Sequence, residues 1–335
     1  MERELKYQGL PKAVLLEKLE PPAGRIRLII DTDTYNEIDD QFAIVYALLS
    51  QEKFSVEGIY AAPFFNTRSS SPQEGMELSF DEIIRLSSKL GHSFDDIAFR
   101  GSGGFLQSID HPYNSDAVSH LIGLAMGSET PLYVAAIGAL TNIASAILIE
   151  PRIIEKIVIV WAGGHAFHWP HTNEFNLRGD LLASRLILDS GVPLVMIPAY
   201  GVTTHLQTTA LEIEKFVQGQ GEIGNFLAER FKAYEGLQSG GSKEIWDIVT
   251  IAYLIDADWV PTYMTASPMV AQQPPEKEPG PNPYPKEKYY LTWSFDNSRH
   301  PIRYAYYVHR DPIYQDLFKK LDHFNKGLIQ LTRNL

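Results

Sequence analysis

Strand-like apolar runs alternate with helical patterns over the first two thirds of the chain, and this alternation limits the folds that it can adopt. Six runs rich in β-branched and apolar residues predict strands: Arg27–Asp31, Val56–Ala62, Asp96–Gly101, Leu132–Gly138, Lys156–Gly164 and Pro193–Gly201. Amphipathic stretches between them predict helices, among them Gln41–Ser50, Phe80–Leu90, Asn142–Ile149 and Asp180–Ser190. Continuously apolar strands separated by helices indicate βαβ units. We therefore predict an α/β fold with a mainly parallel central sheet covered by helices on both faces.

The last third of the chain predicts a mixed region of helices and strands. Helices are predicted at Ala210–Phe216, Ile223–Tyr234 and Lys243–Ile255, and a loop rich in proline and charge follows at Gln272–Lys286. Two strand-like runs predict a hairpin and the last pattern a terminal helix: Tyr289–Phe295, Ile302–Val308 and Pro312–Leu331. Few boundaries interrupt this pattern, so we expect an N-terminal extension over residues 1–24 and a single domain over 25–335.

Charge and composition exclude several classes of function. The formal net charge of −12 argues against a general nucleic-acid binder, which would carry a basic surface. Cysteine is absent, which excludes disulfides, thiolate metal sites and cysteine nucleophiles. No apolar run reaches the roughly 20 residues of a membrane span, and the first residues do not resemble a signal peptide. We expect a cytoplasmic protein with no membrane partner.

An acidic cluster follows the first predicted strand. Five carboxylates fall within ten positions: Asp31, Asp33, Glu37, Asp39 and Asp40. Ligands of parallel α/β proteins bind beyond the carboxyl ends of the strands, where this cluster would lie. Like charges this close require solvent, protonation or a cation, and oxygen ligands suit Ca²⁺ or Mg²⁺. Alternatively, Asp39 caps the next helix and Asp40 complements its dipole, but Asp31 and Asp33 then stay unexplained.

The acidic segment resembles the N-terminal motif of the nucleoside hydrolase family, Asp-x-Asp-Pro-Gly-x-Asp-Asp. Here Asp31-Thr32-Asp33 and Asp39-Asp40 match the two aspartate pairs. The loop between the pairs is two residues longer than in the family and lacks the Pro-Gly step. The departure concerns the path of the loop and leaves the carboxylates in place.

Further segments carry the same resemblance in the expected order. The run AAIGALTNIA (135–144) is similar to the family's Gly-x-Leu-Thr-Asn turn, in which the carbonyl before the glycine, here that of Ile137, binds the metal. Alternatively or in addition, Thr141 or Asn142 caps a helix there. The segment at 162–180 resembles the Gly-Gly turn and Glu-Phe-Asn of the family. By that match Glu174 and Asn176 would bind ribose hydroxyls.

Three other positions are matched less directly. His168 stands where the family has an upstream asparagine, and Asn66 stands where the family has a pocket-lining asparagine. The segment IWDIVTIAYLIDA (245–257) resembles the late helix whose first aspartate, here Asp247, completes the metal site.

The resemblance implies a Rossmann-like hydrolase that cleaves the N-glycosidic bond of ribonucleosides to give free base and ribose. It implies Ca²⁺ as the cofactor, held by Asp33, Asp40, Asp247 and the Ile137 carbonyl. Asp33 would also be the general base, and Asp39 would contact a ribose hydroxyl. The partner would be a small nucleoside, and homodimers or homotetramers are expected.

Trp246 bears on the choice of base. Many family members have His before the late aspartate, where it protonates the leaving group, whereas a Trp-Asp pair resembles the purine-preferring branch, in which indoles sandwich the base. We therefore expect purine nucleosides to be favoured; alternatively, Trp246 is a core residue on an apolar helix. The leaving-group acid is left unassigned among the histidines near predicted strand ends, which are His165, His168, His171 and His205.

Two alternatives to a nucleoside hydrolase remain open at this point. The segment IIDTDTY also fits a phosphatase of the haloacid-dehalogenase type, with Asp31 as nucleophile and Asp33 as acid and with Mg²⁺ as the metal. The other alternative is a homologue that binds metal and nucleoside without turnover.

Overall fold

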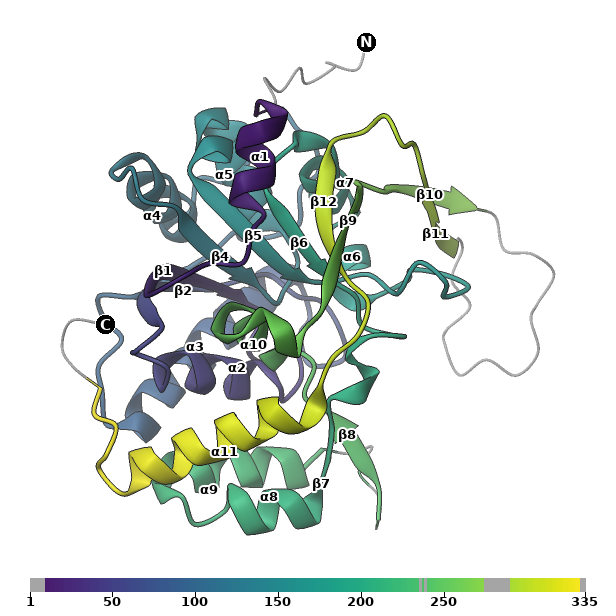
Figure 1. Cartoon of the computed structure of the whole chain (residues 1–335). Coiled ribbons are helices and arrows are strands. Elements are labelled where there is room, and N and C mark those ends of the chain that lie inside the picture. The colour runs from purple at the N-terminus through teal and green to yellow at the C-terminus, as the bar shows by residue number, and fades with distance from the viewer. Residues whose placement is uncertain (1–9, 235–236, 238–239, 274–289, 332–335) are drawn as a thin grey trace.

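The computed structural model describes residues 10–234, 237, 240–273 and 290–331 (Figure 1). Within them, the central sheet has eight strands in the order β3-β2-β1-β4-β5-β6-β12-β9. Their bounds are β1 Ile26–Thr32, β2 Phe54–Ala61, β3 Ala98–Arg100, β4 Leu132–Ala136, β5 Ile157–Ala162, β6 Leu194–Ile197, β9 Thr262–Ala266 and β12 Pro301–Ala305. Neighbouring strands are parallel except β12 and β9, which are antiparallel. The predicted mainly parallel sheet is confirmed.

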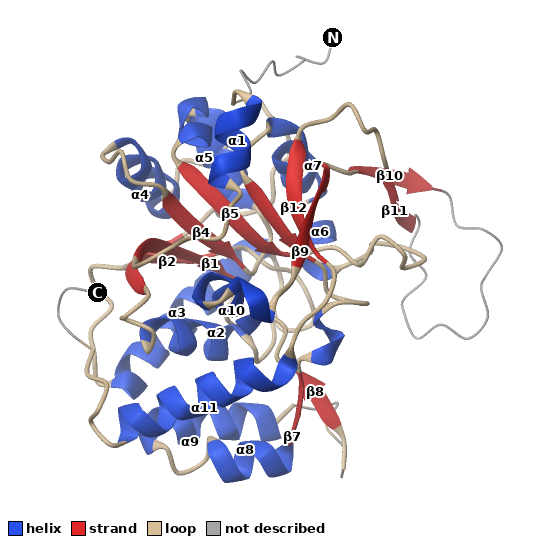
Figure 2. Ribbon diagram, viewed as in Figure 1, coloured by secondary structure: helices blue, strands red, loops and turns tan. Residues whose placement is uncertain are grey.

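Helices cover both faces of the sheet, as predicted (Figure 2). One face carries α4 (Asp116–Met126), α5 (Thr141–Ile149) and α7 (Leu181–Ser190). The other face carries α2 (Asp40–Leu48), α3 (Pro72–Leu90) and α10 (Ile248–Ile255), with α8 (Ala210–Phe216), α9 (Gly221–Lys232) and α11 (Arg310–Asn325) outside them. The remaining short elements are α1 Lys12–Lys18, η1 Pro151–Glu155, α6 Phe175–Gly179, η2 Thr203–His205, β7 Gln207–Thr209, β8 Ser242–Glu244, η3 Ala257–Trp259, β10 Met269–Gln273 and β11 Tyr290–Ser294.

Strand β1 shows why the apolar runs form a buried sheet. Successive side chains of a strand point to opposite faces. Leu28 and Ile30 therefore enter the core under α2 and α10, whereas Ile29 enters the core under α4 and α5. All three are fully buried. A strand buried on both faces cannot alternate apolar and polar residues, which explains the continuous run.

The C-terminal strands pair differently from the prediction. The expected hairpin of 289–295 with 302–308 is wrong: β11 pairs with β10, and β12 lies between β6 and β9. Strand propensity identified both runs, but it does not choose partners, which depend on packing with distant elements. Of the predicted loop Gln272–Lys286, residues 274–286 lie outside the described residues.

Several helices and strands begin or end at residues other than those predicted. Helix α3 begins at Pro72 rather than Phe80, because Ser71 caps it by accepting a hydrogen bond from the Glu74 amide. The predicted helix Lys243–Ile255 is strand β8 followed by a helix that starts at Ile248. The terminal helix α11 ends at Asn325 rather than Leu331, and the third strand is only three residues long.

The described part of the predicted N-terminal extension packs onto the sheet. Helix α1 and the residue after it bury Leu15 and Leu19. Arg303 of β12 donates from Nε to the Leu19 carbonyl (2.6 Å) and pairs with Glu20 (3.0 Å). Leu19 is thus tied to β12, which lies 284 residues later in the sequence at Arg303.

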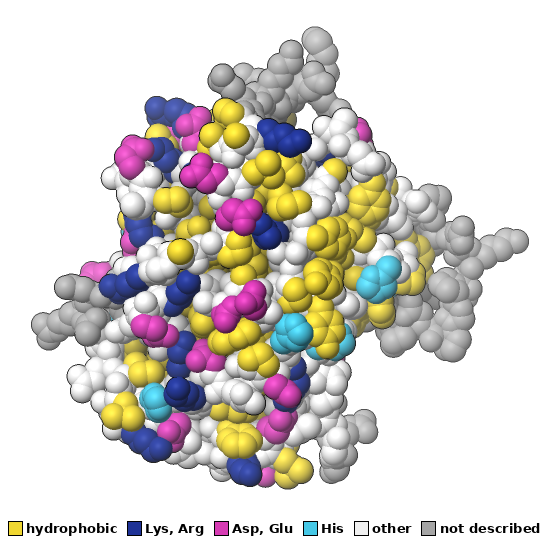
Figure 3. Space-filling view, in the orientation of Figure 1, with side chains coloured by type: hydrophobic (Ala, Val, Ile, Leu, Met, Phe, Trp, Pro, Cys, Tyr) yellow, Lys and Arg dark blue, Asp and Glu magenta, His cyan; other side chains and the backbone are white. Residues whose placement is uncertain are grey.

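Strand β9 forms one outer edge of the sheet, and hydrophobic side chains gather there (Figure 3). Tyr263 and Met264 of β9 are exposed, as are Tyr306 and Tyr307 just after β12. None of the helices that the described residues form is long and apolar enough to cross a bilayer.

Candidate active site

The acidic cluster lies beyond the carboxyl end of β1, at the centre of the sheet. Asp33 follows the strand directly, while Asp39 and Asp40 stand at the start of α2. Asp247 immediately precedes α10, which packs against α2. The structure therefore brings Asp247 to the aspartates, from which it is about two hundred residues distant in the sequence.

The carboxylates converge closely enough to share one ion. Oxygens of Asp39, Asp40 and Asp247 all lie within 4.8 Å of one another, and all three residues are buried. Asp33, which was predicted as a ligand, is not one of these three, but it is buried, its charge interacts with theirs, and its Oδ2 has no hydrogen-bond partner among the described residues. An unpartnered buried oxygen beside three other carboxylates is a costly arrangement that a cation would relieve.

Burial and mutual repulsion shift the pKa values of the cluster in one direction. Burial raises the pKa of Asp33 well above its usual range, and the charges of Asp40, Asp39 and Glu174 raise it further. Burial raises the pKa of Asp247 in the same way, with added repulsion from the other aspartates. A bound divalent cation favours the ionised carboxylates and reverses these shifts. The donor set, which contains oxygen only, fits a hard cation of the Ca²⁺ or Mg²⁺ type.

Asp39 and Asp40 lie at the start of α2, a place where acidic side chains often cap a helix. Asp39 occupies the N-cap position of α2 but makes no capping hydrogen bond, so the alternative in which it caps that helix is wrong. Asp40 Oδ1 accepts a hydrogen bond from Thr32 Oγ1 (2.6 Å). This contact ties the start of α2 to the end of β1, and thereby orients Asp40.

The turn after β4 approaches the cluster through its backbone. A Cβ on Gly138 would lie 3.1 Å from the Asp33 amide nitrogen and 3.0 Å from Ala62 Cβ, so only glycine fits without displacement. The carbonyl of Ile137, just before this glycine, accepts a hydrogen bond from Asn176 Nδ2 (3.2 Å). The turn thus carries the predicted carbonyl ligand to the edge of the cluster.

Glu174 and Asn176 are fixed by the start of α6. The Glu174 carboxylate accepts hydrogen bonds from the backbone amides of Gly164, Asn176 and Leu177 at 2.8–2.9 Å. Burial raises the pKa of Glu174 despite these bonds. The side chain is close enough to Asp33 for their charges to interact. Both residues therefore border the aspartates, and their roles toward ribose stay predictions.

Asn142 was predicted as one of two possible helix caps, but it makes other hydrogen bonds in the structure. Helix α5 has Leu140 at its N-cap with no side-chain capping bond, so neither Thr141 nor Asn142 caps it. Asn142 Nδ2 instead donates to Asp31 Oδ1 (2.7 Å), and its Oδ1 accepts from the Ser102 amide (2.7 Å) and hydroxyl (2.8 Å). Burial raises the pKa of Asp31 to about 7, while the Asn142 bond lowers it. Asn142 therefore anchors β1 where the site begins.

Replacing Asn142 by Ala is expected to destabilise the protein by about 2–3 kcal/mol, because buried polar groups of Asp31 in β1 and of Ser102 after β3 lose their partner. Urea unfolding followed by circular dichroism measures the change. Asn225→Ala is the matched control, since Asn225 is exposed and its Oδ1 accepts a hydrogen bond from the Gly219 amide (2.8 Å). A stability equal to that of the control would contradict the anchoring role.

Aromatic rings line the side of the site near β5 and β6. The half-buried Trp246 contacts Tyr200 edge-on (ring centroids 5.7 Å apart), and Tyr200 stacks on His165 (4.5 Å). Trp246 is therefore not a fully buried core residue. Burial and the neighbouring His171 lower the pKa of His165 to about 3, so its imidazole is neutral at pH 7.

The other two predicted positions lie at the margin. Asn66 donates from Nδ2 to Asn36 Oδ1 (2.6 Å), which places it against the lengthened aspartate loop. His168 is exposed and lies beside Gly201, whose φ of +89° requires glycine. The part of each residue in binding stays a prediction.

Sequence reasoning did not single out Lys243, which is buried beside the acidic loop. Its Nζ lies 3.1 Å from Glu37 Oε2. The available signal was its position four residues before Asp247, but a helix was predicted there, and a lysine at the start of a helix is ordinarily solvated.

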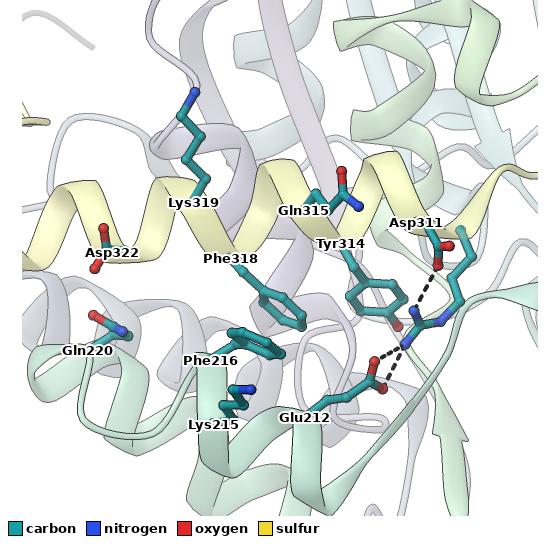
Figure 4. A pocket seen from close by; sticks show the side chains of 11 residues that line it. Glu212, Lys215, Phe216, Gln220, Asp311, Tyr314, Gln315, Phe318, Lys319 and Asp322 are labelled. Atoms are coloured by element: carbon teal, nitrogen blue, oxygen red, sulfur yellow. Dashed lines mark hydrogen bonds and ion pairs between the residues drawn. The ribbon is translucent and has the colours of Figure 1, made fainter.

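A separate groove of about 610 Å³ lies between α8 and α11 (Figure 4). Phe216 and Phe318 stack within it (5.1 Å), and Arg310 pairs with Glu212 (2.6 Å) at one end. Its lining includes none of the predicted site residues. The groove is therefore distinct from the acidic cluster.

Comparison with known proteins places the chain in a family. A family model described as inosine-uridine preferring nucleoside hydrolase matches residues 85–292, more than half of the chain. The pyrimidine-specific ribonucleoside hydrolase RihB of Escherichia coli O1:K1 / APEC is 29% identical over 160 residues, which cover 44% of this chain and 50% of the relative. The protein of the same name from Shigella flexneri serotype 5b (strain 8401) is 30% identical over 159 residues. The chain spans about half the length of the curated relatives that it matches.

Solved structures agree on the fold. A purine-preferring ribonucleoside hydrolase from Gardnerella vaginalis superimposes with a TM-score of 0.68 at 22% identity, over 90% of this chain and 99% of that one. A plant nucleoside hydrolase, PpNRh1, gives a TM-score of 0.68 at 20% identity, over 89% of this chain and 99% of that one. The matched sequence and the shared fold lead to one conclusion: the chain belongs to the inosine-uridine preferring nucleoside hydrolase family.

Proposed function

We propose that the protein hydrolyses the N-glycosidic bond of ribonucleosides in a calcium-dependent reaction and that it prefers purine nucleosides. The observation that carries the proposal is the convergence of Asp39, Asp40 and Asp247 within 4.8 Å, beside Asp33 with its unpartnered Oδ2. Family membership supports the reaction class, and the oxygen-only donor set supports a hard cation.

Different residues would bind the metal, accept the proton and hold the ribose while the C1′–N bond breaks. Asp33, Asp40, Asp247 and the Ile137 carbonyl would hold the calcium ion, which when bound polarises a water molecule and grips the ribose diol. Asp33 Oδ2, which has no hydrogen-bond partner in the described part of the chain, would take the proton of the attacking water. Asp39 and Asn176 hold ribose hydroxyls, and the surrounding carboxylates stabilise the positive charge that develops on the sugar.

The leaving base is held by aromatic rings. Trp246 and Tyr200 offer ring faces and edges to a flat heterocycle, and stacking of this kind is stronger for the larger purine ring. His165 is neutral at pH 7, since the pKa is lowered to about 3, so it is not an imidazolium donor. We propose that the departing base takes its proton from solvent, which is easier for a purine because its charge is more widely spread.

The names of similar proteins point in both directions on base preference. The curated relatives are named pyrimidine-specific, whereas a protein that shares the fold is named purine-preferring. We base the preference on Trp246 of this chain. The phosphatase alternative fits less well, because its nucleophile Asp31 is fully buried and held by Asn142.

A reducing-sugar assay on inosine, guanosine, uridine and cytidine tests the proposal. We expect ribose release from inosine and guanosine about tenfold or more above that from the pyrimidines, given the discrimination that one pocket contact typically gives. Release should stop in EDTA and return with added Ca²⁺. Phosphate release from phosphomonoesters without ribose release would support the phosphatase. Nucleoside binding by calorimetry without turnover would identify a binding homologue.

A further inference from the structure

Lys243 is a buried cation beside the acidic cluster. The residue lies in β8 and its side chain is 5% exposed. Its Nζ donates to the Glu244 carbonyl (2.8 Å) and lies 5.3 Å and 5.4 Å from the ring centroids of Tyr234 and Trp246. A lysine is rarely buried unless a negative partner compensates the lost hydration.

The partner of Lys243 is Glu37, which lies in the lengthened loop between the aspartate pairs. Glu37 Oε2 lies 3.1 Å from Lys243 Nζ, and the carboxylate also bonds to the side chain of Tyr234. Arg68 donates to the Glu37 carbonyl (3.1 Å), which fixes the backbone at the same point. The carboxylate is thus held by side chains that come from outside the loop.

Glu37 lies close enough to the cluster to act on its charge. Its charge contributes to raising the pKa values of Asp39, Asp40 and Asp247, although burial is the larger cause for each. Its carboxylate is not among the three whose oxygens converge within 4.8 Å, and, unlike Asp33 Oδ2, it is engaged by Lys243 and Tyr234. A further carboxylate therefore borders the site without entering it.

We infer that Lys243 is a positioning residue that holds Glu37 outside the metal site and lowers the affinity of the site for a divalent cation. This inference rests on the calcium site of the proposed function. Glu37 and Lys243 form a neutral pair, which leaves Asp33, Asp40 and Asp247 as the proposed carboxylate ligands of the ion. Lys243 also opposes the ion directly, because its charge interacts with that of Asp39, one of the converging carboxylates, and like charges in a buried site repel each other.

The same pair stabilises the site before metal binds. Burial lowers the pKa of Lys243, but the charges of Asp39 and Glu37 outweigh burial and raise it overall. The ammonium group is then the positive charge that offsets the acidic residues around it. Removing the ammonium group should lower the stability of the calcium-free protein. The loss should be smaller with calcium bound, because the bound cation replaces the missing positive charge.

The decisive measurement is calcium affinity without nucleoside, by isothermal titration calorimetry, together with Tm in EDTA and in Ca²⁺. We expect Lys243→Met to bind Ca²⁺ about tenfold more tightly than the wild type. We also expect its Tm to fall in EDTA and the rise in Tm on adding Ca²⁺ to be larger than in the wild type. Lys243→Arg should restore the wild-type values of both.

Lys320→Met is the matched control. Lys320 is also buried and pairs with Glu52 and Asp316 (2.9 Å each), but it lies in α11 and not in the acidic cluster. Its replacement should lower Tm equally in EDTA and in Ca²⁺. Glu37→Gln removes the negative charge and keeps Lys243, so we expect this variant to bind calcium at least about threefold more weakly than the wild type. Glu37→Gln tests the same inference if Lys243→Met does not fold.

The outcomes separate this inference from the proposed function. Unchanged or weaker calcium binding by Lys243→Met, or unchanged binding by Glu37→Gln, overturns the inference while leaving the calcium site intact. A wild type that shows no calcium binding overturns both. Altered calcium affinity in a protein that releases no ribose supports the inference and counts against the proposed reaction.

Discussion

Replacing Asp33 by Asn is expected to lower kcat for ribonucleoside hydrolysis by about three orders of magnitude or more, with the fold retained. The variant lacks both the proton acceptor and a proposed calcium ligand. The substituted amide keeps the volume of the buried side chain. Steady-state ribose release with saturating nucleoside and Ca²⁺ measures the loss.

A second readout distinguishes this loss from unfolding. Asp33 is buried among like charges, so Asp33→Asn should raise Tm in EDTA by relieving repulsion. Asp81→Asn, an exposed change in α3, is the control and should alter neither value. Near-normal turnover by Asp33→Asn would exclude Asp33 as the base.

Replacing Asp247 by Asn is expected to weaken calcium binding about a hundredfold, because the site loses its charged ligand at the start of α10. Ribose release should fall with it at low Ca²⁺ and recover in part at high Ca²⁺. Calorimetric titration of the protein with Ca²⁺ measures the affinity directly.

Asp256→Asn is the control for this change. Asp256 stands at the opposite end of α10 and accepts a hydrogen bond from the Asp258 amide (3.0 Å). Its loss should leave calcium affinity unchanged. If Asp247→Asn binds calcium as tightly as this control does, Asp247 is not a ligand.

The sequence predicted those features that local chemistry determines. The strand ending at Asp31 was placed within one residue at each end of β1, since a continuous apolar run leaves little choice. The acidic loop was recognised from its carboxylates alone. The resemblance to a family then linked Asp247 to that loop, which no local pattern could do.

The features that were missed depend on distant partners. Asn142 was taken as a possible helix cap, because that is what Asn does locally, yet it bonds Asp31, 111 residues away. Lys243 pairs with Glu37 across 206 residues. In the same way, strand β12 was recognised as a strand but assigned to the wrong neighbour. The local sequence pattern identifies a helix or strand, whereas the residues that it contacts depend on the packing of distant segments.

Because β12 lies between β6 and β9, the sheet cannot be completed until the C-terminal part of the chain has been synthesised. A ribosome delivers β1 to β6 long before Pro301–Ala305, so the outer edge of β6 waits without a neighbour while about a hundred further residues are made. During that interval the edge can recruit strands from other nascent chains. Arrested translation before β12 would leave that edge permanently open, and such fragments should be targets for chaperones and proteases.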